Sequence, residues 1–196
     1  MARYAKVDRT TKETQIQIEI ELDGKGEVNI DTGIGFFDHM LTLLGIHGRF
    51  DLKIKAKGDL DVDYHHTVED TGIVLGRALA KAYGDKISIK RYGVSYIPMD
   101  EALSRVVVDL SSRPFLIMKT DCPVEKIGQM DSELFEEFFR AIAFNAGMTL
   151  HIETFYGTNG HHIYESVFKA FGRALKESCM IDCEINGVMS SKGTFL

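Results

Sequence analysis

Two copies of a His-His-x-x-Glu motif carry side chains that could bind metal ions. The first copy is His65-His66-Thr67-Val68-Glu69, and the second, 96 residues later, is His161-His162-Ile163-Tyr164-Glu165. Each copy is followed by the string Gly-Arg-Ala-Leu, whose glycine stands eleven positions after the first histidine. A pattern that returns at matched spacing indicates an internal duplication of the chain.

The spacing within each copy is typical of metal ligands on a helix. Residues four apart share a helix face, so His65 and Glu69 point the same way, and so do His161 and Glu165. The second histidine of each copy is rotated by roughly 100° and faces a different neighbourhood. Imidazole and carboxylate together suit a divalent manganese, iron, cobalt, nickel or zinc ion. A single pair of histidines would fit a polar helix start equally well, but two copies in phase with a glutamate favour metal binding.

His39 and Glu137 are further candidate ligands. His39 lies off the apolar stripe of a predicted helix over residues 36–47, and His47 lies on roughly the same side of that helix. At an offset of 98 residues, His39 aligns with Glu137, whose carboxylate can also bind a metal. Glu137 belongs to an acidic helix start, which the helix dipole favours without any metal, so both interpretations stay open.

Composition disfavours several classes of function. The chain has 196 residues, 44% of them hydrophobic, which is ordinary for a soluble globular protein of one or two small domains. The net charge of −6 disfavours a general nucleic-acid binder. No apolar run approaches the about 20 residues of a membrane span, and Met1-Ala2-Arg3-Tyr4 does not begin a signal peptide. The three cysteines, an odd number without metal-binding spacing, are typical of reduced thiols in a cytoplasmic protein.

Hydrophobic periodicity divides the chain into strands and helices. Strands are predicted over residues 14–22, 27–30, 50–56, 87–97, 104–110 and 115–119, and around His151. Helices are predicted over residues 36–47, 64–83, 133–147 and 161–179. Asp23-Gly24 is expected to close a hairpin between the first two strands. The polar segment from Arg9 to Glu13 is expected to be a solvated loop.

These elements predict an α+β protein made of two similar halves, each with the order ββαβα. The expected boundaries are 1–86 for the first half, 87–185 for the second and 186–196 for a C-terminal tail. Helices would cover one face of each sheet, and either the opposite sheet faces or the halves themselves would pack together. In the tail, Ser190-Ser191-Lys192-Gly193 offers two hydroxyls and an ammonium to a phosphate, although a solvated tail is the simpler interpretation.

The order of motifs along nearly the whole chain resembles the imidazoleglycerol-phosphate dehydratase family of histidine biosynthesis. The resemblance rests on Gly33-Ile34-Gly35-Phe36-Phe37-Asp38-His39-Met40-Leu41, His47-Gly48, His65-His66-Thr67-Val68-Glu69-Asp70, Lys90-Arg91-Tyr92-Gly93, Ser112-Arg113-Pro114, Thr149-Leu150-His151-Ile152, Asn159-Gly160-His161-His162, Lys169-Ala170-Phe171-Gly172-Arg173-Ala174-Leu175 and Ser190-Ser191-Lys192-Gly193.

The resemblance implies halves that fold like the second domain of ribosomal protein S5. It also implies trimers assembled into a 24-subunit cage, with two Mn²⁺ ions in each active site at subunit interfaces. The implied metal ligands are His39, His65, His66, Glu69, Glu137, His161, His162 and Glu165. The family often has a histidine where this chain has Glu137, a departure that could shift metal affinity or preference. The implied substrate contacts are Glu13, His39, His47, Arg91, Arg113, Ser190, Ser191 and Lys192. The polar loop and the tail would then contact the substrate, whereas the residues alone indicated only solvated segments.

The implied activity is that of a hydro-lyase, the metal-dependent loss of water from imidazoleglycerol phosphate to give imidazole acetol phosphate. Glu13 is the preferred general base, with Glu69 and Glu165 as catalytic alternatives.

Two other classes of function are alternatives: a binuclear hydrolase, which would use the same ligands, and a non-catalytic module that stores metal or binds RNA. A binuclear metal hydrolase acting on a phosphate ester would release phosphate. A metal-storage module would not need the set of Arg91, Arg113 and Lys192. An RNA-binding module would carry basic patches, which the acidic balance disfavours. The expected partners are therefore a small phosphate substrate and further copies of the chain, with neither nucleic acid nor membrane.

Overall fold

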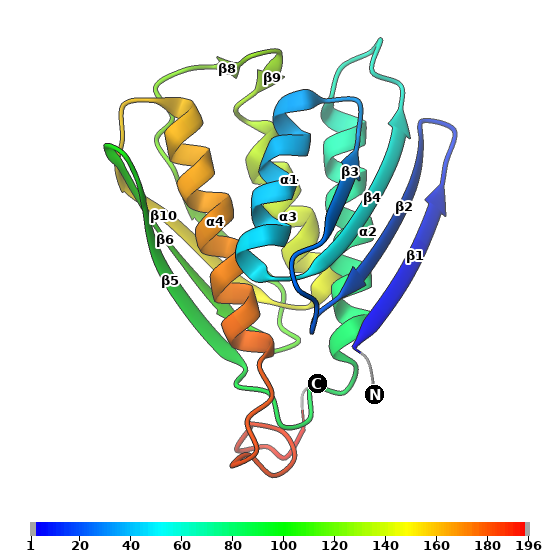
Figure 1. Ribbon diagram of the computed structural model, residues 1–196, viewed down its shortest axis with the longest axis vertical. Helices are drawn as coiled ribbons and strands as arrows, with labels where there is room; N and C mark the ends of the chain where they lie inside the picture. The colour runs from blue at the N-terminus through cyan, green and yellow to red at the C-terminus, as the bar shows by residue number, and fades with distance from the viewer. Residues whose placement is uncertain (1–2, 195–196) are drawn as a thin grey trace.

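The computed structural model describes residues 3–194 as four layers, with a β-sheet on each outer side and two layers of helices between them (Figure 1). The α+β class and the division into two similar halves are confirmed. Of the two packing arrangements that the sequence left open, the halves pack through their helices, and both outer sheet faces remain uncovered within the chain.

The first half begins with a mixed sheet. The first half contains β1 (Tyr4–Thr10), β2 (Thr14–Glu21), β3 (Val28–Asp31), α1 (Gly35–Gly48), β4 (Asp51–Gly58) and α2 (His65–Tyr83). The strand order is β1-β2-β4-β3, with β3 parallel to β4 and the other pairs antiparallel. Alternate residues of β2 and β4, such as Ile18 and Leu52, are buried beneath α1 and α2 because a strand presents every second side chain to one face.

The second half repeats this plan. It contains β5 (Tyr92–Met99), β6 (Ala102–Asp109), β7 (Phe115–Lys119), α3 (Leu134–Ala146), β10 (Thr149–Tyr156) and α4 (Gly160–Cys179). The strand order β5-β6-β10-β7 matches that of the first sheet, and β7 again runs parallel to its neighbour. The insertion between β7 and α3 carries a short hairpin of β8 (Lys126–Ile127) and β9 (Met130–Asp131).

The first half has one strand more than the predicted order ββαβα, because β1 precedes β2. Its counterpart β5 overlaps the strand predicted over residues 87–97, which that order left out, and the hairpin of β8 and β9 was not predicted. In the first half, β1 covers part of the segment expected to be a loop. The two buried apolar positions of β1, Ala5 and Val7, form a pattern too short to stand out in the sequence. Arg9, at the next inward position, donates a hydrogen bond to Asp70 of α2 and so replaces an apolar contact with an ion pair.

The expected hairpin at Asp23-Gly24 is wrong, because β4 lies between β2 and β3. The chain after Asp23 crosses the end of the sheet instead. Asp51 Oδ1, at the start of β4, accepts the backbone N–H groups of Lys25, Gly26 and Glu27 at 2.8, 3.0 and 2.9 Å. These three hydrogen bonds hold the crossing segment against β4 and satisfy backbone donors that a hairpin would have paired.

The helices of one half pack directly on those of the other, α1 on α4 and α2 on α3. The glycines of the two Gly-Arg-Ala-Leu strings lie at these contacts. A Cβ added to Gly172 would lie 2.6 Å from the carbonyl oxygen of Leu44, and one added to Gly76 would lie 2.9 Å from that of Ile142. The repeated glycine therefore serves close helix approach, since only a residue without a Cβ fits there.

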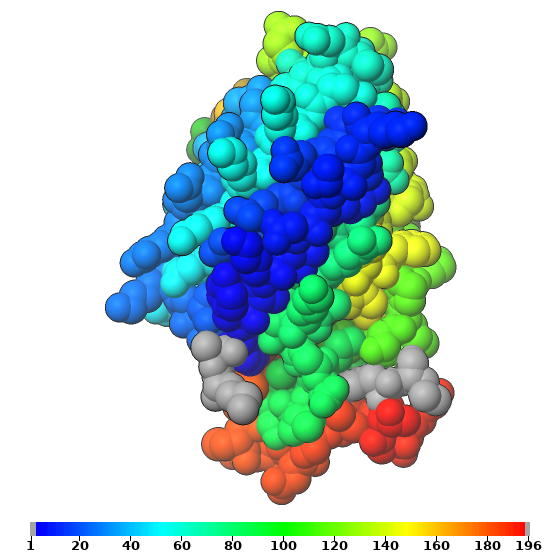
Figure 2. All heavy atoms as spheres, turned by 90° about the vertical axis from the view of Figure 1, so that its right-hand side faces the viewer, coloured from blue at the N-terminus to red at the C-terminus, as the bar shows by residue number. Residues whose placement is uncertain are grey.

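All four helices begin at the same end of the molecule, the upper end in Figure 1. The β1–β2 and β5–β6 turns reach this end too, whereas the C-terminal segment, orange to red, lies at the opposite end in Figures 1 and 2. We name these the helix-start end, defined by the first turns of α1, α2, α3 and α4, and the tail end, defined by residues 181–194. Within residues 3–194, no helix combines the length and hydropathy needed to cross a bilayer.

The substitution Gly172→Ala should lower the free energy of unfolding by about 1–3 kcal/mol, because the added methyl group must push α1 away from α4. Chemical denaturation at fixed protein concentration measures the change. The control is Gly35→Ala, where no atom lies within 4 Å of the added carbon and helix propensity favours alanine. Equal stability of the two variants would contradict the importance of this helix contact.

Candidate functional site

Both His-His-x-x-Glu motifs open a helix at the helix-start end, and an Asx side chain fixes each opening. Asp63 Oδ1 accepts the backbone N–H of His65 at 2.7 Å, and Asn159 Oδ1 accepts that of His161 at 2.9 Å. Each acceptor stands two residues before its histidine, so the duplication preserves this cap as well as the motif. Such hydrogen bonds satisfy the free N–H groups of a first helical turn and hold the histidines at a defined place.

His39, His161 and Glu165 come together from α1 and α4. One ligand atom from each lies within 4.8 Å of the others. Nε2 of His39 donates to Glu165 Oε1 at 2.8 Å, and Nε2 of His161 lies 3.6 Å from the same oxygen. Two imidazole nitrogens and a carboxylate oxygen form a donor set that fits a divalent transition metal.

The surroundings keep Glu165 ionised and the cluster in place. Partial burial opposes ionisation, but hydrogen bonds from Lys169 at 2.8 Å and from His39 outweigh it and lower the pKa of Glu165. The Phe36 ring packs against His161 with its centroid 5.0 Å away. The carboxylate is therefore charged and pre-oriented before any ion binds.

The corresponding set of the first half is less compact. His65 Nε2 lies 3.6 Å from Glu69 Oε2, as the helical spacing predicts. Glu137 is on the first turn of α3, where its carboxylate lies 3.7 Å from Arg140 Nε. Across the described residues 3–194, His39, His161 and Glu165 form the one group of three or more ligand atoms so close together.

The second histidine of each motif is bound to a carboxylate that the sequence did not single out. His66 Nδ1 donates to Asp59 Oδ2 at 3.0 Å, and His162 Nδ1 donates to Glu101 Oε2 at 2.6 Å. These hydrogen bonds raise the pKa of each imidazole. The bond from His162, together with backbone N–H groups of Asn159 and Thr158, lowers the pKa of Glu101 to about 2.

The C-terminal segment folds back to form a pocket of about 230 Å³ at the tail end. It is lined by Arg91, Ser111, Arg113, Ser190, Ser191, Lys192 and Thr194. Two basic guanidinium groups, an ammonium and several hydroxyls in one small pocket suit a phosphate group. The structure thus brings together five of the predicted substrate residues, although they come from three separate segments of the chain.

Arg91 is the most constrained residue of this pocket. Its Nε and Nη2 donate to Asp109 at 2.7 and 3.1 Å, and its Nη1 donates to the Met189 carbonyl at 2.7 Å. Asp109 raises the pKa of Arg91, which secures its charge. The backbone of Arg91 has φ 71°, a left-handed conformation that costs a non-glycine residue about 1–2 kcal/mol. The hydrogen bond from Arg91 N to the Ser178 carbonyl, at 3.0 Å, holds that conformation on the last turn of α4.

The remaining predicted site residues lie apart from these two groups. Glu13 is exposed on the β1–β2 turn at the helix-start end. The hydrogen bond to Asp59 raises the pKa of His66, and the charge of Glu13 adds to this effect. His47 lies near the end of α1 beside Arg49, Arg173 and Lys176, in a basic groove. Its pKa is lowered by burial and then by Lys169 and Arg173.

Sequence reasoning missed Lys169, Asp59 and Glu101 as site residues. Lys169 stands four residues after Glu165, and this spacing alone would have paired them on one helix face. Asp59 and Glu101 face their histidines across loops and turns of unequal length, a placement that helical periodicity does not reveal.

Together, the fold and these groups define a duplicated α+β protein with a candidate divalent-metal centre and a separate phosphate-type anion pocket. A family model described as imidazoleglycerol-phosphate dehydratase matches residues 32–175. The chain belongs to the imidazoleglycerol-phosphate dehydratase family.

Individual relatives match over nearly the whole chain. An imidazoleglycerol-phosphate dehydratase of Clostridium kluyveri is 59% identical over 97% of this chain and 98% of its own length. One of Acetivibrio thermocellus is 58% identical over 98% of this chain and 99% of its own. The crystal structure of the enzyme from Staphylococcus aureus has a TM-score of 0.83 and 45% identity, covering 91% of this chain and 99% of that one. The Pyrococcus furiosus enzyme, in complex with (S)-C348, also has a TM-score of 0.83, with 35% identity over 96% of this chain and 99% of that one.

Proposed function

We propose that this chain removes water from imidazoleglycerol phosphate to give imidazole acetol phosphate, the dehydration step of histidine biosynthesis for which its family is named. The observation that carries the proposal is the convergence of His39, His161 and Glu165 in a chain of this family. The pocket of Arg91, Arg113 and Lys192 supplies what the phosphate of such a substrate requires.

The proposed metal centre holds two Mn²⁺ ions. Its ligands are His39, His65, His66, Glu69, Glu137, His161, His162 and Glu165. The donor set supports this assignment, because imidazole nitrogens with carboxylate oxygens suit borderline divalent ions. When bound, the ions would make the imidazole ring of the substrate electron-rich by favouring its deprotonated form. Glu137 supplies an oxygen donor where the family often has an imidazole, and that favours a harder ion at this position.

The residues of the chain account for binding and for proton transfer. The reaction breaks a C–O bond beside the ring and a C–H bond on the neighbouring carbon, and the enol that forms becomes the ketone of the product. The C–H proton requires a base. Glu165 is occupied by Lys169 and His39 and has a lowered pKa, and Glu69 faces His65. Glu13 is exposed, and its carboxylate accepts no hydrogen bond from residues 3–194, so it is the carboxylate free to take the proton.

Complete active sites are formed from several copies of the chain in this proposal. His161 opens α4 and Arg91 is bonded to Ser178 near its end, so roughly 25 Å of helix separates the ligand cluster from the phosphate pocket. A small phosphate substrate is far shorter than this separation. The tail of one copy, residues 186–194, must therefore approach the helix-start end of another. We propose that the trimer-based cage of 24 subunits is the assembly that brings the copies together.

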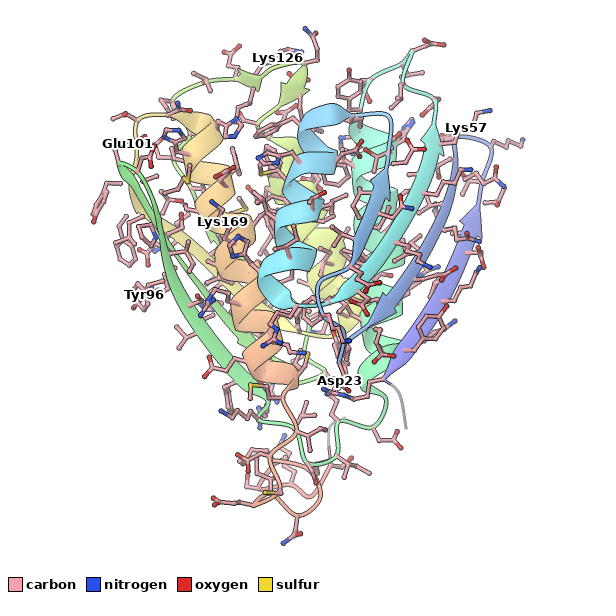
Figure 3. All side chains as sticks on the ribbon, viewed as in Figure 1. Asp23, Lys57, Tyr96, Glu101, Lys126 and Lys169 are labelled. Carbon is pink, nitrogen blue, oxygen red and sulfur yellow. The ribbon has the colours of Figure 1, made fainter. Side chains whose placement is uncertain are left out.

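The outer face of the second sheet is suited to contact between copies. It exposes large apolar side chains, each at least 44% accessible: Tyr92, Val94, Tyr96, Phe115, Phe155 and Tyr156. Tyr96 points away from β5 in Figure 3. The outer face of the first sheet carries charged and amide side chains instead, paired as Lys6 with Glu19 and Gln17 with Asp8. The Arg105 guanidinium, paired with Glu153, lies over the Tyr96 and Phe155 rings on this face. Exposed aromatic side chains gathered in this way mark an interaction surface.

Removal of metal with a chelator should abolish formation of imidazole acetol phosphate, and added Mn²⁺ should restore it. Product formation from imidazoleglycerol phosphate, followed with and without Mn²⁺, measures both effects. Release of phosphate would identify a binuclear hydrolase instead. A protein that binds Mn²⁺ tightly but converts no substrate would retain the ligand assignment and lose the dehydratase assignment.

The substitution Glu13→Gln should lower turnover by about 10²–10⁴-fold, because the amide cannot take the C–H proton. Steady-state kinetics on the metal-loaded protein measures kcat. The matched control is Glu27→Gln, which neutralises an exposed carboxylate of the same half. If Glu13→Gln kept most of its turnover, Glu69 or Glu165 would become the candidate base.

Two inactive variants should complement each other if each site draws on different copies. Arg113→Ala removes part of the phosphate pocket and His161→Ala part of the metal centre, so each variant alone should be inactive. When equal amounts are dissociated together and reassembled, half of the phosphate pockets and half of the metal centres are intact. Random pairing then joins two intact parts in about a quarter of the sites, so activity should return toward about a quarter of the wild-type value. Mixing His39→Ala with His161→Ala should restore nothing, since both defects lie at one end. Mixed assemblies without activity would place each site within one copy.

A further inference from the structure

Two carboxylates outside the ligand set are arranged to orient metal-binding histidines. Glu101 lies at the tip of the β5–β6 turn, at the upper left of Figure 3. Its Oε2 accepts the Nδ1 proton of His162 at 2.6 Å. Its Oε1 accepts the backbone N–H groups of Thr158 and Asn159 at 3.0 and 2.8 Å. The carboxylate is therefore fixed on both sides, and it holds the loop before α4 as well as the imidazole.

In the first half, an aspartate from a different segment accepts the Nδ1 proton of the second histidine. Asp59, in the loop between β4 and α2, accepts the Nδ1 proton of His66 at 3.0 Å. The loop containing Asp59 spans residues 59–64, whereas the corresponding loop between β10 and α4 spans only residues 157–159. The shorter loop contains no acidic residue, and Glu101 of the β5–β6 turn accepts the histidine proton instead.

The equivalence of the two sheets gives Glu101 a counterpart. Strand β2 (Thr14–Glu21) and strand β6 (Ala102–Asp109) correspond at an offset of 88 residues, so Glu13 corresponds to Glu101. Glu13 lies on the β1–β2 turn at the helix-start end, as Glu101 lies on the β5–β6 turn. Because Asp59 already accepts the His66 proton, the Glu13 carboxylate is left without a hydrogen bond from residues 3–194.

We infer that Asp59 and Glu101 are positioning residues, each of which holds its histidine in the tautomer that leaves Nε2 free to bind metal. The inference rests on the metal centre proposed above. A carboxylate that accepts the Nδ1 proton places the remaining lone pair on Nε2 and fixes the plane of the ring. Nε2 of His162 lies 3.9 Å from Asp100 Oδ2, beyond hydrogen-bond distance, and is therefore not occupied by that carboxylate. Because Asp59 accepts the Nδ1 proton of His66, Glu13 does not accept it, although its counterpart Glu101 accepts the proton of His162.

The substitution Glu101→Gln tests the inference without removing the loop contact. The amide oxygen can still accept the N–H groups of Thr158 and Asn159, but its NH₂ group donates to Nδ1 and forces the proton of His162 onto Nε2. At His66 the matching variant is Asp59→Ala, which removes the acceptor, because both oxygens of Asp59 lie within 3.3 Å of Nδ1 and an asparagine would still offer an amide oxygen to it. The control is Asp61→Asn, which removes an equal charge from an exposed carboxylate two residues from Asp59.

Two measurements decide the outcome. In the metal-free protein, at a pH that keeps imidazoles neutral, ¹⁵N chemical shifts should show Nδ1–H for His66 and His162, with a change to Nε2–H only at the histidine whose partner is altered. Titration of free Mn²⁺ by electron paramagnetic resonance should show affinity weakened by about 10–100-fold in Glu101→Gln and Asp59→Ala and unchanged in Asp61→Asn.

The possible failures are distinguishable. Unchanged tautomers and unchanged Mn²⁺ affinity in both variants, in a wild-type protein that binds Mn²⁺, would overturn the positioning role and leave the metal centre intact. A wild-type protein that binds no divalent metal would overturn the metal centre, and the positioning role with it. Thermal unfolding of metal-free Glu101→Gln at the wild-type temperature would show that weakened affinity does not come from a loosened loop.

Discussion

The close contact between the helices of the two halves is the constraint on which the rest of the structure depends. Gly76 and Gly172 bring α2 onto α3 and α1 onto α4 at distances that a Cβ would not allow. With the helices locked side by side, their first turns lie at one end of the molecule (Figure 1). The positive ends of four helix dipoles then favour the carboxylates placed there. A packing contact that both halves share thus determines where the candidate metal ligands lie.

At that end, pairs of imidazole and carboxylate groups organise one another. Glu165 takes hydrogen bonds from His39 and Lys169, while Asp59 and Glu101 each take the Nδ1 proton of a histidine. Each carboxylate thereby lowers the orientational freedom of an imidazole before an ion arrives. In the metal centre proposed above, a bound ion would take the place of the proton between His39 and Glu165, whereas the Nδ1 contacts of His66 and His162 would remain. The candidate ligands are thus pre-oriented by one another and by Asp59 and Glu101, whose hydrogen bonds do not depend on an ion.

The duplication preserved this frame while the two halves diverged in their outer surfaces and at the tail end. Arg3 and Arg91 correspond at an offset of 88 residues. The Arg3 guanidinium is held by Asp23 and by the carbonyl of Cys179, whereas Arg91 contributes to the anion pocket. The first outer sheet face carries pairs such as Lys6 with Glu19, whereas the second exposes aromatic rings around the Arg105 and Glu153 pair. Of the two equivalent scaffolds, only the second half carries the anion pocket and the exposed aromatic side chains of β5 and β10 within residues 3–194.

The sequence by itself determined the four helices, the strands other than β1, β8 and β9, the duplication and the pairs of residues four apart, because helical and strand periodicity are local properties that side-chain spacing records. His65 with Glu69, His161 with Glu165, and the buried stripe of Val68, Leu75 and Leu79 follow from it. Only the tertiary structure decided that β4 separates β2 from β3, that Asp59 and Glu101 face histidines, and that the anion pocket lies a helix length from the metal ligands. These are contacts between segments far apart in the chain, and their geometry depends on loop lengths and helix packing that no local pattern encodes.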